Sequence, residues 1–83
     1  MELTNLEAAA ISLIVDKKAS FFDDGVEVGS STYTDDFTDD MVSFMGLSQQ
    51  AAGGVLSSLI KKGVFSSTGE EIYLTELGVA AAK

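Results

Sequence analysis

The sequence predicts one small α+β domain, in which three helices are followed by a strand hairpin and a short final helix. Residues 4–18 combine a helix-capping pattern with apolar residues at helical spacing. Residues 46–63 carry a second helical apolar stripe with glycine at each end, and residues 64–74 resemble two short strands joined by a turn. The chain has 83 residues, without proline, repeats or a linker-like segment, so we expect residues 1–83 to form a single domain.

The first helix is expected to run from Asn5 to Lys18. Thr4 and Glu7 fit a capping box, in which each side chain accepts a hydrogen bond from the other residue's backbone. The apolar stripe that follows consists of Leu6, Ala10, Leu13 and Ile14, widened by Ile11 and Val15. Lys17 and Lys18 would then lie at the negative end of the helix dipole.

Residues 19–33 carry the weakest pattern in the chain. Asp23-Asp24-Gly25 indicates a turn, Val26-Glu27-Val28 alternates like a short edge strand, and residues 29–31 resemble a loop. We expect one short strand somewhere in this segment.

A second helix is expected to begin at Thr34 or at Thr38 and to end at Gly46. Its apolar face would consist of Phe37, Met41, Phe44 and Met45. Gly46 suits the left-handed conformation that commonly follows a helix, and Ser48 suits the N-cap of the next helix.

The third helix is expected from Gln49 to Lys62 and is stopped by Gly63. Its predicted buried stripe is Ala52, Val55, Leu56, Leu59 and Ile60. Gly53 and Gly54 fall in mid-helix, where each should cost about 1 kcal/mol relative to alanine.

A hairpin should follow, with strands at 64–66 and 72–74 and a turn at 67–70. Ile72 and Leu74 would face one side of the sheet and Tyr73 the other, because side chains alternate along a strand. Thr75 would cap a short last helix that ends near Ala82.

Two segments, LSSLIKKGVF (56–65) and YLTELG (73–78), together with the turn at Met45–Ser48, resemble the winged-helix superfamily of bacterial and phage regulators. The resemblance covers the chain except residues 19–33. It implies a three-helix helix-turn-helix core, a two- or three-stranded wing and a short C-terminal helix, and it is consistent with a phage-like origin.

The resemblance also implies a binding surface on the third helix and the wing. The positions facing a DNA groove or another partner would be Gln49, Gln50, Gly53, Gly54 and Ser57, with Thr68 and Gly69 at the hairpin end. Either glutamine could contact adenine through two hydrogen bonds. A dimer formed through the first and last helices would pair two such helices.

The charge pattern favours a protein partner over DNA. The net charge is −8, arginine is absent, and seven acidic residues but no basic ones lie between Lys18 and Lys61. DNA-binding proteins usually have the opposite balance, because phosphate neutralisation supplies much of their affinity. The sequence therefore predicts a regulatory module, in a transcription or phage–host setting, that binds a basic protein through the acidic residues of the second helix and the glycine-flattened third helix. This acidic set is Asp35, Asp36, Asp39 and Asp40.

Other interpretations stay open. A winged-helix DNA-binding regulator, acting as a homodimer, is the main alternative. A third is a structural module whose fold persists without groove contacts. The carboxylates could equally be a solvated helix face, and the two glutamines plain helix surface. Gly53 and Gly54 could reflect tight packing inside the domain.

Several function classes are not expected. Without histidine, cysteine or arginine the chain lacks the usual catalytic bases and nucleophiles, so we predict no enzyme activity and no cofactor. Asp23-Asp24-Gly25 lacks the ligand spacing of a calcium loop, so no metal site is expected. No apolar run reaches membrane-spanning length, and Ala8–Val15 has no basic residues before it as a signal peptide would. We expect a cytoplasmic protein that does not enter a membrane.

Overall fold

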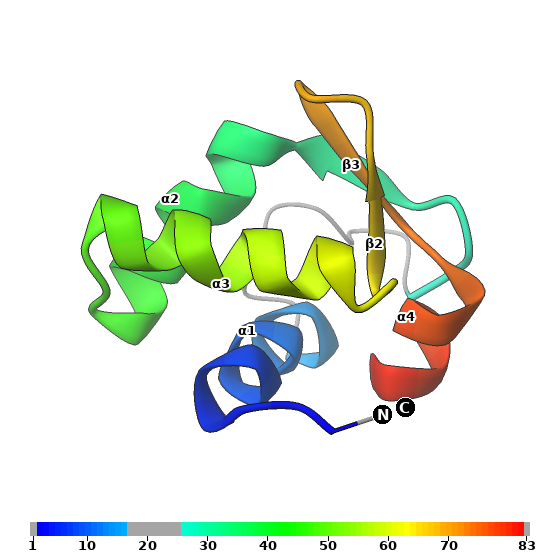
Figure 1. Ribbon diagram of the computed structural model, residues 1–83, viewed down its shortest axis with the longest axis horizontal. Coiled ribbons are helices and arrows are strands. Elements are labelled where there is room, and N and C mark those ends of the chain that lie inside the picture. Colours follow the sequence, from blue (N-terminus) through cyan, green and yellow to red (C-terminus); the bar gives the residue numbers. More distant parts are fainter. Residues whose placement is uncertain (1, 17–25, 83) are drawn as a thin grey trace.

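The computed structural model describes residues 2–16 and 26–82 (Figure 1). In these residues the fold is α+β, with four helices and a three-stranded antiparallel sheet, an arrangement compatible with the predicted winged helix. The elements in chain order are α1 (Asn5–Val15), β1 (Ser31–Tyr33), α2 (Thr34–Met45), α3 (Gln49–Lys61), β2 (Phe65–Ser67), β3 (Glu71–Leu74) and α4 (Glu76–Ala82).

The sheet has the order β1-β3-β2, so the last strand lies between the other two. Tyr33 of β1 lies opposite Glu71, and Ser31 lies opposite Tyr73. Because side chains alternate across a sheet, these residues share its outer face, while Ile72, Leu74 and Phe65 on the inner face are buried.

One hydrophobic core lies between the helices and the inner face of the sheet. Its largest buried members are Phe37, Phe65, Ile14, Met41, Leu59, Ile72 and Leu74. Phe37 of α2 and Phe65 of β2 meet edge to face, with ring centroids 5.4 Å apart, which fixes α2 against the sheet. In Figure 1, α3 is drawn above α1 and below the start of α2, and it contacts both helices.

The predicted caps at the start of α1, between α2 and α3, and after α3 are confirmed. Thr4 and Glu7 form both bonds of the capping box, and the Ser48 hydroxyl accepts a hydrogen bond from the Ala51 amide. Gly46 follows α2 with φ of +68°, and Gly63 follows α3 with φ of +84°; both values favour glycine.

The strand expected in residues 19–33 exists, but it lies at 31–33 rather than at 26–28. Residues 29–31 were predicted as loop, but they already pair with β3. Gly29 N–H donates to Leu74 O, and Leu74 N–H donates to Ser30 O, each at 2.8 Å, and this segment leads directly into β1. Pairing with β3 decides this position, because the location of a three-residue strand depends more on the strand it pairs with than on its own sequence. The predicted turn at 23–25 and the helix end at Lys18 lie outside the described residues.

Five residues of the predicted apolar stripes are less buried than expected: Leu6, Val15, Phe44, Met45 and Ile60. Phe44 is 53% exposed, whereas Phe37 and Met41 on the same helix are fully buried. Ile60 is only partly buried. All five lie near the ends of their helices, where the neighbouring elements no longer cover the apolar stripe. The remaining differences are small: α1 ends at Val15, α3 ends at Lys61, and the hairpin strands begin one residue away from their predicted starts.

Candidate functional site

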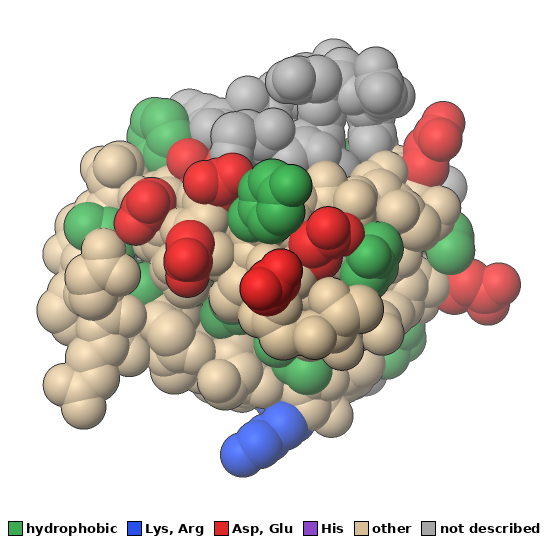
Figure 2. Space-filling view, turned by 90° about the horizontal axis from the view of Figure 1, so that it is seen from above, with side chains coloured by type: hydrophobic (Ala, Val, Ile, Leu, Met, Phe, Trp, Pro, Cys, Tyr) green, Lys and Arg blue, Asp and Glu red, His purple; other side chains and the backbone are tan. Residues whose placement is uncertain are grey.

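The fold brings the acidic start of α2 next to the acidic end of the hairpin. Thr34, the first residue of α2, donates its backbone N–H to Glu70 O at 2.8 Å and its hydroxyl to Gly69 O at 3.1 Å. We call the resulting surface the acidic face and define it as Asp35, Asp36, Asp39, Asp40, Glu70 and Glu71. Figure 2 shows carboxylates gathered on this side of the molecule.

The carboxylates of this face are largely in solvent. Asp35, Asp36, Asp39 and Glu70 are exposed, whereas Asp40 and Glu71 are partly buried. Asp35 and Asp36 take part in no ion pair within the described part of the chain. Their charges therefore act on approaching molecules and are weakened mainly by water and salt.

The predicted acidic row on α2 thus becomes part of a larger surface. The sequence shows the acidic hairpin end separately, but Glu70 lies 35 positions from Asp35. Only the pairing of β1 with β3 joins them. A signal was present in the sequence as two acidic clusters, without any indication that they would meet.

Tyr33 lies within the acidic face and is 59% exposed. Two open hollows, of about 300 and 370 Å³, share Tyr33 and Asp36 in their walls. The first is lined also by Ser31, Thr32 and Glu71, and the second by Thr34, Asp35, Gly69 and Glu70. Tyr33 was not among the predicted site residues, although an aromatic residue directly before an acidic helix start was a visible signal.

The outer surface of α3 adjoins this face at one corner. Gln49 donates from Nε2 to Asp39 Oδ1 at 3.3 Å, so one predicted partner-facing residue is held by the acidic row. Gln50, Gly54 and Ser57 are exposed and follow one another at helical spacing, while Gly53 is partly buried. Thr68 and Gly69 are exposed at the hairpin end.

Tight internal packing does not explain Gly53 and Gly54. A Cβ atom added at either position would meet nothing within 4 Å outside its own helix. The fold therefore has no steric need for glycine there, although each lowers the stability of the helix. The two residues leave a flat, open part of α3.

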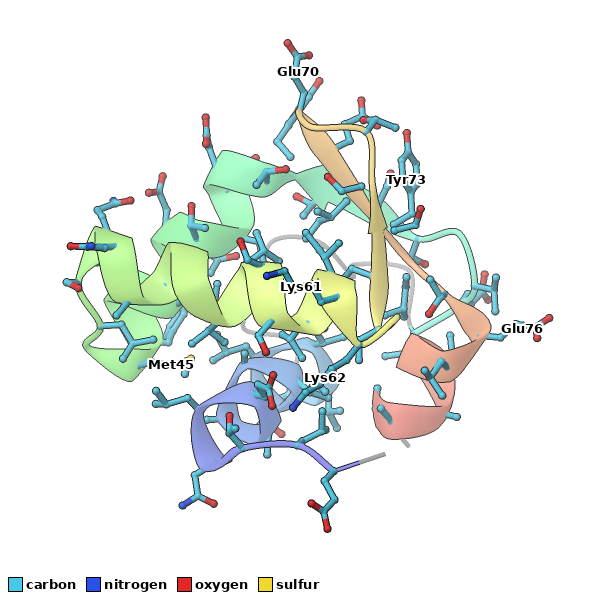
Figure 3. The ribbon with its side chains drawn as sticks, in the orientation of Figure 1. Met45, Lys61, Lys62, Glu70, Tyr73 and Glu76 are labelled. Atoms are coloured by element: carbon cyan, nitrogen blue, oxygen red, sulfur yellow. The ribbon has the colours of Figure 1, made fainter. Side chains whose placement is uncertain are left out.

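A charge cluster lies on the side of α3 that faces α1, at residues predicted only as a helix cap and a helix end. The Glu7 side chain is 2% exposed, and its carboxylate accepts hydrogen bonds from Ser58 Oγ at 2.5 Å and Lys62 Nζ at 2.6 Å. The Lys62 ammonium, then the Ser58 hydroxyl, lower the pKa of Glu7 from 4.5 to about 2. The Lys62 side chain is 33% exposed but its ammonium is held by Glu7, and Figure 3 shows it pointing toward α1, whereas Lys61 lies on the outer side of α3.

No family, curated protein or solved structure gives a significant match to this chain. Among residues 2–16 and 26–82, no cluster of three or more possible metal ligands occurs. None of the helices seen in that same part of the chain has the length and apolar character required to span a membrane.

Proposed function

We propose that the protein is a non-enzymatic winged-helix module with a regulatory role, which binds a basic protein partner through the acidic face and the adjoining flat surface of α3. The observation that carries this proposal is the meeting of two acidic clusters, one from α2 and one from the hairpin, on one side of the domain.

The element order supports the winged-helix assignment. A helix, a strand, two helices and a hairpin follow one another, and the first strand pairs with the last, as expected for a helix-turn-helix core with a three-stranded wing. The surface that such a domain usually offers to DNA here carries Gln50, Gly54 and Ser57, none of which can neutralise a phosphate, and a cation, Lys61, appears on this stripe at the C-terminal end of α3.

The charge of the acidic face supports a basic partner. Carboxylates spaced a helical turn apart lie about 5–6 Å from one another and form a row that complements lysine and arginine side chains. Such complementarity accelerates association and selects against acidic partners, including nucleic acid.

One observation favours the alternative, a dimeric DNA-binding regulator. Gln50, Gly54, Ser57 and Lys61 form an exposed stripe along α3, which a groove could accept. A homodimer would double the few contacts that this stripe offers.

Binding of a fluorescent lysine- and arginine-rich peptide at about 0.15 M salt tests the proposal. Replacement of Asp35, Asp36, Asp39 and Asp40 by asparagine should weaken peptide binding at least tenfold. A tenfold loss of affinity corresponds to about 1.4 kcal/mol, which is a modest loss for the removal of four charge interactions. The matched control replaces exposed carboxylates on other segments by their amides: Glu2, Asp16, Glu27 and Glu76.

The control has the same change in net charge, so it should retain binding if the acidic face is the site. Equal weakening in both variants would overturn the proposal, since it would indicate only general attraction. Sequence-specific binding of duplex DNA at micromolar or lower concentration, lost on Gln49→Ala/Gln50→Ala substitution, would establish the alternative in its place.

A further inference from the structure

Tyr33 occupies a position where its side chain does little for the fold. It is the N-cap residue of α2, yet its side chain makes no capping hydrogen bond, and 59% of the residue is exposed. Serine, threonine, aspartate or asparagine would stabilise the helix start better. The neighbouring Thr34 hydroxyl is not available for that task, since it bonds Gly69 O.

The residues around Tyr33 are arranged on three elements. Glu71 lies opposite Tyr33 in the β1–β3 pair, and Tyr73 lies two residues further along β3 on the same face. The Tyr73 hydroxyl donates to Glu71 Oε2 at 2.7 Å, and Glu71 lines the first hollow together with Tyr33. Asp36, on the first turn of α2, completes the wall of the first hollow, which has a volume of about 300 Å³. Figure 3 shows Tyr73 on β3, below the hairpin end that carries Glu70.

An exposed aromatic ring beside two carboxylates has a defined preference. The face of the ring attracts cations, and the carboxylates add charge and hydrogen-bond acceptors. A guanidinium group can use both, because it is planar, stacks on aromatic rings and donates several hydrogen bonds in a fixed plane. An ammonium group gains the charge attraction but stacks less well.

We propose that the hollow beside Tyr33 holds an arginine side chain of the basic partner, with the guanidinium on the Tyr33 ring and hydrogen-bonded to Asp36 and Glu71. This inference rests on the proposed function and names the anchor within the acidic face. An anion would be repelled there, and an apolar group would remove water from two carboxylates without replacing their hydrogen bonds.

The test compares three peptides of one sequence, carrying arginine, lysine or neutral citrulline, in fluorescence anisotropy at about 0.15 M salt. Tyr33→Leu should weaken the arginine peptide about threefold to tenfold and the lysine peptide less, and Tyr33→Phe should restore the wild-type preference for arginine. Asp36→Asn should weaken the arginine peptide more than Asp39→Asn, which changes charge equally on the same helix but does not line the hollow.

The outcomes separate this inference from the proposed function. If the four-aspartate variant loses peptide binding while Tyr33→Leu retains full affinity and arginine preference, the arginine anchor is wrong and the acidic face remains. If neither variant differs from the control that replaces carboxylates elsewhere, both proposals fail. Circular dichroism should show unchanged folding in Tyr33→Leu, because the residue is exposed and its side chain caps nothing.

Discussion

Glu7 and Lys62 lie 55 positions apart in the chain, yet Glu7 Oε1 and Lys62 Nζ are 2.6 Å apart in the fold. The same lysine donates to Glu2 O at 3.0 Å, so its ammonium joins the end of α3 to both the first turn of α1 and the segment before it. One carboxylate thus caps α1 through Thr4 and fixes α3 through Ser58 and Lys62.

We expect Lys62→Met to destabilise the domain clearly, because it leaves the Glu7 carboxylate buried without its cation. Urea unfolding followed by circular dichroism measures this loss. The matched control is Lys61→Met, the same substitution at the preceding, exposed residue, which should change the free energy of unfolding by no more than about 0.5 kcal/mol. The interpretation fails if the two variants unfold at the same urea concentration.

Stability should also depend on pH in the acid range. The pKa of Glu7 is about 2 in the fold and 4.5 for the ordinary side chain. A lowered pKa stabilises the folded state above pH 4.5, and that contribution disappears as pH falls toward 2. Glu7→Gln should therefore flatten the decline in thermal midpoint between these two pH values, and an unchanged slope would contradict this assignment.

Gly54→Ala should stabilise the domain by about 1 kcal/mol, because alanine favours the helix and the new methyl group meets open space. Thermal and urea unfolding measure the gain. The same variant tests the binding surface: if the partner packs closely on α3, peptide or partner affinity should fall while stability rises.

Gly78→Ala is the contrasting substitution in α4. A Cβ atom there would lie 2.2 Å from Val64 O and 2.7 Å from the Leu74 side chain, so the chain must shift. We expect a loss of about 1–3 kcal/mol despite the better helix propensity. If Gly78→Ala stabilised the domain as Gly54→Ala should, the close contact of Gly78 with Val64 and Leu74 would be contradicted.

Thr75 should be needed to attach α4 to the rest of the domain. Its hydroxyl accepts a hydrogen bond from Gly78 N–H at 3.0 Å and contacts Gly63 O and Val64 O at 2.5 and 3.0 Å. Thr75→Ala should cost about 1–2 kcal/mol in urea unfolding, and Thr75→Ser should recover most of it. Equal losses in both variants would assign the effect to the methyl group instead.

Local patterns accounted for most element boundaries. The Thr4–Glu7 capping box, the Ser48 cap and the glycine stops all act within a few residues, so they can be recognised without knowing the fold. The strand expected within residues 19–33 could not be placed at 31–33 from the sequence, because its position depends on β3, some 40 residues later. Phe44 was misjudged for a similar reason, since helical spacing cannot show where the covering elements end.

The candidate site divides in the same way. The acidic residues of α2 and the glycine pair of α3 were evident from residue type and spacing alone. Their neighbours were not: Glu70 and Glu71 reach α2 only through strand pairing, and Tyr33 became notable only when its exposure and its two hollows were known.

By itself, the sequence determined the helix caps and most element boundaries, because these depend on residues close in the chain, and it determined the acidic charge through composition. The tertiary structure alone decided which charges remain in water and which are buried. Chain folding buries the Glu7 carboxylate against the partly exposed Lys62 and leaves Asp35 and Asp36 beside Glu70 at the surface. That separation depends on contacts between residues 35 or more positions apart, which no local pattern contains.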